Sequence, residues 1–231
     1  MSVESLFRKR NLPHWDIPAA TYFVTACLAG SISAVGLLEL SQYRHSLEGR
    51  PRPDDMEEVE WEIQKHKLIF DRFDRWLDHK PATRDLKDRR LAAQVRDSIY
   101  HFAEERYDVC AYVVMPSHFH WIFRPKEDWV RTLNSHHVQR GPREIIMHSI
   151  KLYTARECNR ARGRKGRFWQ AESYDHCVRD EAELSRIIEY VEMNPVKANY
   201  ASSPEEWLFS SAKDRQQWNT SYGEPLNPLP R

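Results

Sequence analysis

The pattern of apolar and polar side chains predicts a chain in which strands and helices alternate. Three segments are rich in β-branched and aromatic residues and change polarity from one position to the next, as strands do: residues 20–28 (ATYFVTACL), 108–115 (DVCAYVVM) and 118–123 (HFHWIF). Only Pro116 and Ser117 separate the last two segments, so we expect an antiparallel hairpin there. One or two further short strands are expected within residues 168–178.

Apolar side chains spaced by three or four residues predict helices between these strands. The segments with this spacing are residues 61–77, 86–107 and 145–160. Another helix is expected to begin at Asp180, with Glu183 three residues later as in a capping box, and to stop at Asn194 and Pro195. Residues 41–53 mix Gly, Pro and Arg and are expected to form a loop.

The order strand, helix, strand, strand, helix, strand indicates an α+β fold of the ferredoxin-like (RRM-like) kind, with helices on one face of an antiparallel sheet. We expect a basic N-terminal arm at residues 1–19 and the main domain at residues 20–179. Residues 180–231 are expected to add a C-terminal helical extension and tail packed on the same domain. Because this fold hosts many functions, it does not identify one.

Composition narrows the class of protein. The 231 residues are 41% hydrophobic and 30% charged, which fits one soluble globular domain and excludes a disordered or low-complexity chain. No apolar run approaches about 18 residues and the first residues lack the apolar core of a signal peptide, so a cytoplasmic protein is expected. The four Cys lie far apart, which favours reduced thiols over a zinc site or a disulfide framework.

The formal net charge of +1 conceals an uneven distribution of charge. Residues 140–167 hold nine Lys or Arg against two Glu, a net charge of +7, whereas residues 172–206 hold nine acidic residues against three basic ones. A concentrated basic segment is typical of a protein that binds a phosphate backbone. The alternative is a solvated helix face followed by a basic loop.

The strongest local signal for chemistry is the segment 115–123 (MPSHFHWIF). Side chains alternate between the faces of a strand, so His118 and His120 share one face while Phe119 and Trp121 share the other. Two imidazoles at positions i and i+2 can hold one divalent ion. Taken alone, however, two of the eleven His at this spacing are weak evidence for a metal site.

A second candidate site lies on the predicted helix 145–160. Tyr153 and Glu157 follow Ile146 and Ile150 along one stripe of helical period, which predicts a phenol and a carboxylate on an inward face. An inward Tyr is usually a core residue, but an inward Glu needs a partner. His136, His137 and His148 are treated as surface residues.

At this point the chain resembles the single-tyrosine HUH transposases, and in particular their REP-associated branch (RAYTs). The segments that carry the resemblance are MPSHFHWIF, SIKLYTARECN, GRFWQAESYDHCVRDEAEL, YVEMNPVKANY and the N-terminal RKRNLPHWDIPAATYFVTACL. They occur in the order of that family and span residues 8–212.

The resemblance implies roles for individual residues. His118 and His120 match the histidines that hold a divalent metal, Mg²⁺ or Mn²⁺, and Tyr153 is matched to the nucleophilic tyrosine. Glu157 is placed where relatives have an amide side chain as the third metal ligand, and Ser117 replaces the usual Asn. Tyr174 is the next candidate nucleophile.

The implied activity is metal-dependent nicking and strand transfer of single-stranded DNA at REP-type palindromic hairpins, through a 5′-phosphotyrosine intermediate. A catalytically silent hairpin-binding protein on the same fold is the alternative, and an RNA-binding domain is disfavoured because its RNP pattern is absent. A monomer is expected and a dimer stays open.

Basic and aromatic residues near these motifs are candidates for DNA contact. The predicted phosphate-binding side chains are Arg8, Lys9, Arg10, Arg156, Arg160, Arg162, Arg164, Lys165 and Arg167. Trp121, Trp169 and Tyr174 are candidates for stacking on unpaired bases, with a place in the core as the alternative.

Overall fold

The computed structural model describes residues 20–134, 141–171 and 173–226. The strands are β1 (Tyr22–Cys27), β2 (Tyr107–Val114), β3 (His118–Pro125) and β4 (Tyr174–Cys177). The helices are α2 (Ala34–Glu48), α3 (Glu58–His79), α4 (Arg89–His101), α5 (Glu127–Asn134), α6 (Pro142–Ala161), α7 (Glu181–Lys197) and α8 (Ser211–Trp218). Short 3₁₀ turns occur at Asp85–Lys87 and Pro204–Glu206.

The four strands form one antiparallel sheet in the order β2-β3-β1-β4. The predicted β2–β3 hairpin is confirmed, and the amide of Met115 donates to the carbonyl of His118 across the turn. On its other side β3 pairs with β1, so that His118 lies opposite Cys27 and His120 opposite Thr25. The expected ferredoxin-like α+β fold is therefore confirmed.

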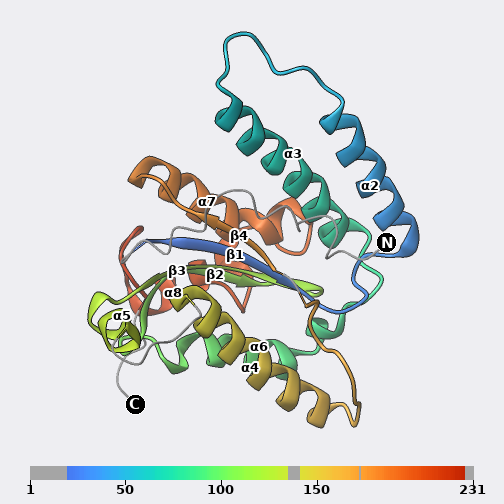
Figure 1. The fold of residues 1–231 in the computed structure, drawn as a ribbon. Helices are drawn as coiled ribbons and strands as arrows, with labels where there is room; N and C mark the ends of the chain where they lie inside the picture. Colours follow the sequence, from blue (N-terminus) through green and yellow to red (C-terminus); the bar gives the residue numbers. More distant parts are fainter. Residues whose placement is uncertain (1–19, 135–140, 172, 227–231) are drawn as a thin grey trace.

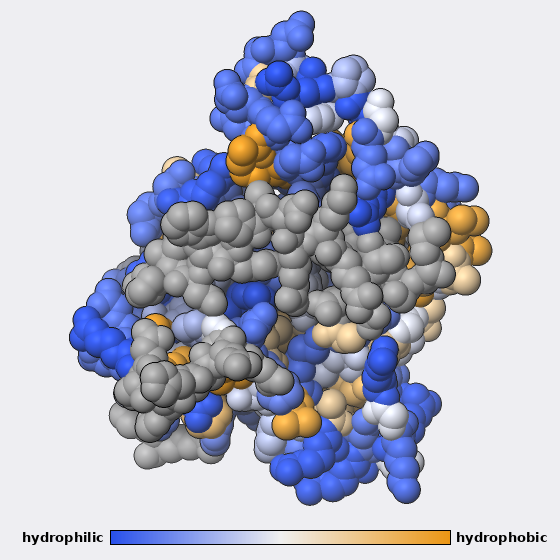
Figure 2. Space-filling view, in the orientation of Figure 1, coloured by the Kyte–Doolittle hydropathy of each residue, from blue (hydrophilic) through white to orange (hydrophobic). Residues whose placement is uncertain are grey.

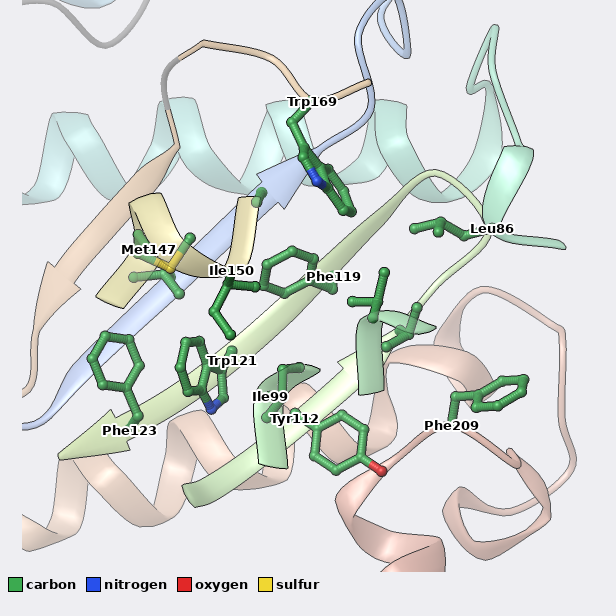
Figure 3. Close-up of a cluster of buried hydrophobic side chains, with 14 of the residues drawn as sticks. Leu86, Ile99, Tyr112, Phe119, Trp121, Phe123, Met147, Ile150, Trp169 and Phe209 are labelled. Atoms are coloured by element: carbon green, nitrogen blue, oxygen red, sulfur yellow. The ribbon is translucent and has the colours of Figure 1, made fainter. Parts of the chain in front are cut away.

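Helices α4 and α6 cover the first face of the sheet (Figure 1). This face is a core of large side chains, among which Trp121 and Phe123 are fully buried and stacked with ring centroids 4.1 Å apart (Figure 3). Ile146 and Ile150 of α6 pack into the same cluster. Burial of such side chains is the main favourable contribution to folding.

The second face of the sheet is also covered, by α7 and by the C-terminal part of α3 (Figure 1). Phe23 and Ile122 of the sheet pack with Ile188 and Val191 of α7 and with Phe70 of α3. The expected arrangement with helices on one face is thus extended by a second helical layer. His118 and His120 lie beneath this second layer.

Helices α2 and α3 form a hairpin inserted between β1 and α4, and its tip projects beyond the sheet (Figure 1). Figure 2 shows that the projecting tip has a predominantly hydrophilic surface. The prediction of a loop at residues 41–53 is wrong as far as Glu48, because the side chain of Ser33 caps α2 and Leu40 and Leu47 are buried. The loop itself comprises residues 49–57.

Helix α7 continues two residues beyond the predicted stop, to Lys197, with Pro195 inside it. A proline lacks the amide hydrogen that would bond one turn earlier, so a position near the helix end loses a single hydrogen bond. Half of the predicted capping box is present at the other end, where the side chain of Asp180 accepts from the amide of Glu183, while the Glu183 carboxylate accepts from the amide of Arg179. Among the described residues, no helix is both long enough and apolar enough to cross a membrane.

Candidate active site

His118 and His120 lie at the centre of the buried second face. Both side chains are 0% exposed, and their Nε2 atoms are 3.1 Å apart. The strand fixes this geometry, because positions i and i+2 of β3 face the same way and Phe119 and Trp121 on the opposite face are locked in the core. Two buried imidazole nitrogens at this separation can converge on one partner.

The hydrogen bonds of Ser117 determine which ring nitrogen of His118 carries the hydrogen. The Ser117 hydroxyl donates its single hydrogen to the carbonyl of Leu77 (2.9 Å), so its oxygen can only accept from Nδ1 of His118, which is also 2.9 Å away. In a neutral His118 the hydrogen is therefore on Nδ1, and Nε2 carries a free lone pair. A metal ion binds an imidazole through such a lone pair. Nδ1 of His120 is likewise engaged, at 2.7 Å from the hydroxyl of Thr25.

Helix α3 brings two carboxylates to the histidines. Oδ1 of Asp74 lies 3.2 Å from Nε2 of His120 and 3.9 Å from Nε2 of His118, while Oδ1 of Asp78 lies 3.7 Å from the latter. Asp74 and Asp78 are 4% and 9% exposed, and among the described residues neither Oδ1 atom has a hydrogen-bond partner. Buried carboxylate oxygens without a partner are costly.

Helix α7 brings a tyrosine and an amide to the same place. The Tyr190 hydroxyl donates to Oδ2 of Asp74, and the ring centroids of Tyr190 and His120 are 5.6 Å apart. One helical turn later, Nδ2 of Asn194 lies 3.4 Å from Nε2 of His120, and its Oδ1 atom is buried with no hydrogen-bond partner in the described part of the chain. A 180° turn of this amide would exchange its oxygen for its nitrogen beside the imidazole.

The electrostatics of the cluster favour a bound cation. Burial and the neighbouring His120 lower the pKa of His118 to about 3, which keeps its imidazole neutral. Burial alone would raise the pKa of Asp74, but His120, His118 and the Tyr190 hydroxyl lower it to about 2. Burial and the charge of Asp74 raise the pKa of Asp78 to about 8. The site thus combines a neutral imidazole with an ionised carboxylate.

The donor set fits a divalent metal ion. One atom from each of Asp74, His118 and His120 lies within 4.8 Å of the others. Ligands of an octahedral ion with bonds of about 2.1 Å are about 3.0 Å apart in adjacent positions and about 4.2 Å apart in opposite ones. The observed separations of 3.1, 3.2 and 3.9 Å span this range. Imidazole and carboxylate ligands suit Mn²⁺, and Mg²⁺ prefers oxygen.

A cavity of about 780 Å³ opens beside Tyr190. Side chains of α3, β4 and α7 line it, and they include Phe70, Tyr174, Lys67 and Arg186. The rings of Phe70 and Tyr174 are stacked with centroids 4.0 Å apart. The cavity is therefore lined by Tyr190, by the aromatic pair and by basic side chains.

The structure does not bring Tyr153 and Glu157 to the histidine pair. Helix α6, which carries both, packs on the first face of the sheet, whereas His118 and His120 lie on the second. The Tyr153 side chain is 45% exposed, at the edge of the buried stripe of α6. Glu157 is buried but forms ion pairs with Arg156 and with another arginine of α6. The prediction that these residues share one site with the histidines is therefore wrong.

The predicted DNA-binding residues fall into three groups. Arg8, Lys9 and Arg10 lie outside the described residues. Arg156 and Arg160 pair with Glu157, and Arg162 pairs with Asp85. Arg164, Lys165 and Arg167 are exposed in the turn after α6, from which the chain returns to the end of β1, where Trp169 pairs with Leu28.

The sequence reasoning missed Asp74, Tyr190 and Asn194. Tyr190 and Asn194 stand four residues apart in the segment YVEMNPVKANY, and that spacing on a helix could have identified them. Asp74 carried a weaker signal, as a carboxylate on the helix face that also presents Phe70 and Leu77.

Fold and site together define a class of protein: a ferredoxin-like domain with a buried His-x-His pair that faces a helix-borne tyrosine. No family model matches the chain. A Haemophilus influenzae protein named as a REP-associated tyrosine transposase is 25% identical over 117 residues, which cover 48% of this chain and 60% of that protein. The chain is thus similar in sequence to a protein named as a REP-associated tyrosine transposase, the branch that its motifs resemble.

A solved structure of the REP-associated tyrosine transposase bound to a REP hairpin is also similar. It has a TM-score of 0.45 and 17% sequence identity, over 90% of this chain and 86% of that one.

Proposed function

We propose that the chain is a metal-dependent enzyme that nicks single-stranded DNA beside REP-type palindromic hairpins and rejoins it through a 5′-phosphotyrosine at Tyr190. The observation that carries this proposal is the meeting of Tyr190, His118 and His120 on the second face of the sheet. The sequence relationship to REP-associated tyrosine transposases supports it, and so does the name of that relative.

His118 and His120 would hold the divalent ion, with Asn194 at the edge of the same cluster. When bound, such an ion stabilises negative charge on the oxygens of a scissile phosphate. Tyr190 is the side chain suited to attack, because its hydroxyl donates to Asp74 of this cluster and its side chain lines the cavity.

In the proposed reaction the Tyr190 oxygen bonds to the scissile phosphorus and the bond from phosphorus to the 3′ oxygen breaks. The tyrosine loses its proton, and the departing 3′ oxygen gains one to become a hydroxyl. Because the phosphoester is kept in the covalent adduct, a 3′ hydroxyl can later attack it and reseal the strand without a further energy source. The products are those of strand transfer and not of hydrolysis.

The cavity between α3, β4 and α7 supplies a route for the unpaired strand. Its aromatic wall offers Tyr174, which is stacked on the buried Phe70, to bases, while Lys67 and Arg186 line the same cavity and are suited to phosphates. The exposed basic turn at residues 164–167 would contact the backbone farther from the cut. Binding through such contacts weakens as salt is raised.

The test incubates the full chain with end-labelled, hairpin-bearing single strands and Mn²⁺, and resolves covalent adducts on denaturing gels. The wild-type protein is expected to form an adduct that Tyr190→Phe abolishes. Tyr153→Phe is the matched control and is expected to keep it, because Tyr153 lies on the other face of the sheet.

An adduct that persists in Tyr190→Phe and disappears in Tyr153→Phe would overturn the assignment. Hairpin binding by the wild type without any adduct would favour the alternative, a catalytically silent hairpin-binding protein.

A further inference from the structure

We propose that the inserted α2–α3 hairpin supplies a ligand of the metal: Oδ1 of Asp74 binds the same divalent cation as His118 and His120, while its Oδ2 holds the Tyr190 hydroxyl. Cation binding then locks the hairpin onto the sheet. This inference rests on the proposed metal site, but it concerns the hairpin and does not depend on any reaction with DNA.

The first argument is the geometry of the Asp74 carboxylate. Its two oxygens face different partners, since Oδ2 accepts from Tyr190 and Oδ1 is directed toward the imidazoles. Oδ1 lies 3.2 Å from Nε2 of His120 and 3.9 Å from Nε2 of His118. An ion placed among the three atoms would satisfy all of them at once.

The second argument is the gathering of unpartnered buried oxygens around the imidazoles. Within residues 20–134, 141–171 and 173–226, Oδ1 of Asp74, Oδ1 of Asp78 and Oδ1 of Asn194 are all buried without a hydrogen-bond partner. Such atoms are rare in native proteins and indicate a missing cation or water. They come from two helices, α3 and α7, which a shared ion would hold together.

The third argument is where the hairpin meets the domain. Its apolar contacts with the sheet lie near its base, where Phe70 belongs to the second-face cluster and Phe73, Leu77 and Leu40 of α2 pack with Cys27 of β1. The tip of the hairpin projects away from the sheet (Figure 1). Asp74 places a buried carboxylate at this attachment, and a divalent cation would offset its charge.

Coordination by Asp74 would also position Tyr190 relative to the cation. A single carboxylate would fix the distance between the cation and the tyrosine oxygen, because its two oxygens belong to one rigid group. Asp74 is then a metal ligand and, for Tyr190, a positioning residue. Loss of the carboxylate charge should weaken metal binding, whereas loss of the Tyr190 hydroxyl should leave it unchanged.

The experiment measures Mn²⁺ binding by electron paramagnetic resonance and hydrogen exchange of the backbone with and without Mn²⁺, on the full chain in the absence of DNA. In the wild type, Mn²⁺ is expected to slow amide exchange in residues 70–79 of α3 as well as in β3. Asp74→Asn should raise the Kd for Mn²⁺ by about tenfold or more and remove the protection of α3.

The controls are Asp71→Asn, which removes an exposed carboxylate from the same helix, and Tyr190→Phe, which retains both oxygens of Asp74. Each should change the Kd for Mn²⁺ by less than about threefold. An Asp74→Asn protein with wild-type affinity, or Mn²⁺ protection of β3 without α3, would overturn the proposal. The exchange measurement on the wild type decides the matter even if Asp74→Asn does not fold.

The outcome is separable from the proposed activity. Asp74-dependent Mn²⁺ binding without any DNA adduct would support this inference and contradict the proposed function. The reverse result, with adduct formation and Asp74-independent binding, would leave only the proposed function standing.

Discussion

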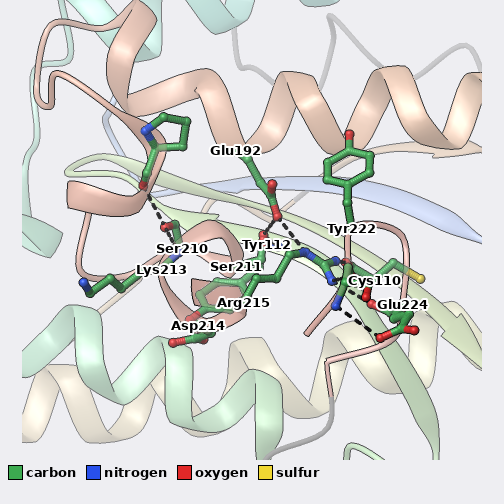
Figure 4. A network of polar contacts seen from close by, with 12 residues as sticks. Cys110, Tyr112, Glu192, Ser210, Ser211, Lys213, Asp214, Arg215, Tyr222 and Glu224 are labelled. Atoms are coloured by element: carbon green, nitrogen blue, oxygen red, sulfur yellow. Dashed lines mark hydrogen bonds and ion pairs between the residues drawn. The ribbon is translucent and has the colours of Figure 1, made fainter. Parts of the chain in front are cut away.

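The guanidinium of Arg215 is the centre of a buried network that holds α7 in place (Figure 4). Its Nε donates to Oε1 of Glu192 on α7, and its remaining donors reach the carbonyls of Cys110, Ser221 and Glu224. Arg215 and Glu192 are each only 7% exposed. Because Glu192 is two residues from Tyr190, this network fixes the helix that carries the proposed nucleophile.

Replacement of Arg215 by Met keeps much of the side-chain volume and removes the charge and all of its donors. The Glu192 carboxylate would keep only its hydrogen bond from Ser211, at 2.7 Å. Removal of one partner of a buried ion pair typically costs about 3–5 kcal/mol, because the other charge stays buried and uncompensated. We expect Arg215→Met to lower the free energy of unfolding by this amount.

Urea unfolding followed by circular dichroism measures the loss. Lys213→Ala, on the same helix, is the control and should change stability by less than about 0.5 kcal/mol. In the double variant with Glu192→Gln no charge is stranded, so its loss should be smaller than the sum of the two single losses by at least about 1 kcal/mol. A loss below about 1 kcal/mol for Arg215→Met, or strict additivity, would refute the reasoning.

Two further predictions concern other buried polar contacts. Thr154 accepts a hydrogen bond of 2.8 Å from the indole of Trp169, so Thr154→Val should cost about 1–3 kcal/mol in urea unfolding while Thr154→Ser stays close to the wild type. Burial would raise the pKa of Glu183, but hydrogen bonds from Arg179 lower it from 4.5 to about 2. Ionised Glu183 therefore contributes stability that is fully present above about pH 4.5 and is lost as the pH falls toward 2. The stability difference between wild type and Glu183→Gln should shrink over that range, and a constant difference would contradict the assignment.

The sequence pattern was sufficient to predict the sheet and half of the residues of the site. The β2–β3 hairpin and the shared face of His118 and His120 follow from alternation along a strand, which is a local property. The inserted hairpin was only half predicted, because α2 has a weak apolar periodicity and its buried Leu40 packs against Phe73 and Leu77, which are distant in sequence.

The rest of the site depended on which face of the sheet each helix covers. Helical period places Tyr153 on an inward stripe of α6 and equally places Tyr190 on an inward stripe of α7, and nothing local distinguishes the two. The structure does, because α6 packs on the first face and α7 on the second. Asn194 meets His120 across 74 residues of chain, a separation over which periodicity carries no information.

Strand β3 therefore contributes side chains both to the hydrophobic core and to the candidate active site. Phe119 and Trp121 are held at 0% exposure on the first face, and they alternate with His118 and His120 on the second. Close packing of the aromatic pair restricts movement of the backbone between them, so the imidazole pair is presented by the most rigid part of the fold. The partners that α3 adds come instead from an insertion attached at one end. Any adjustment of the site on binding a cation or a DNA strand should accordingly take place in the hairpin, with the histidines as the fixed reference.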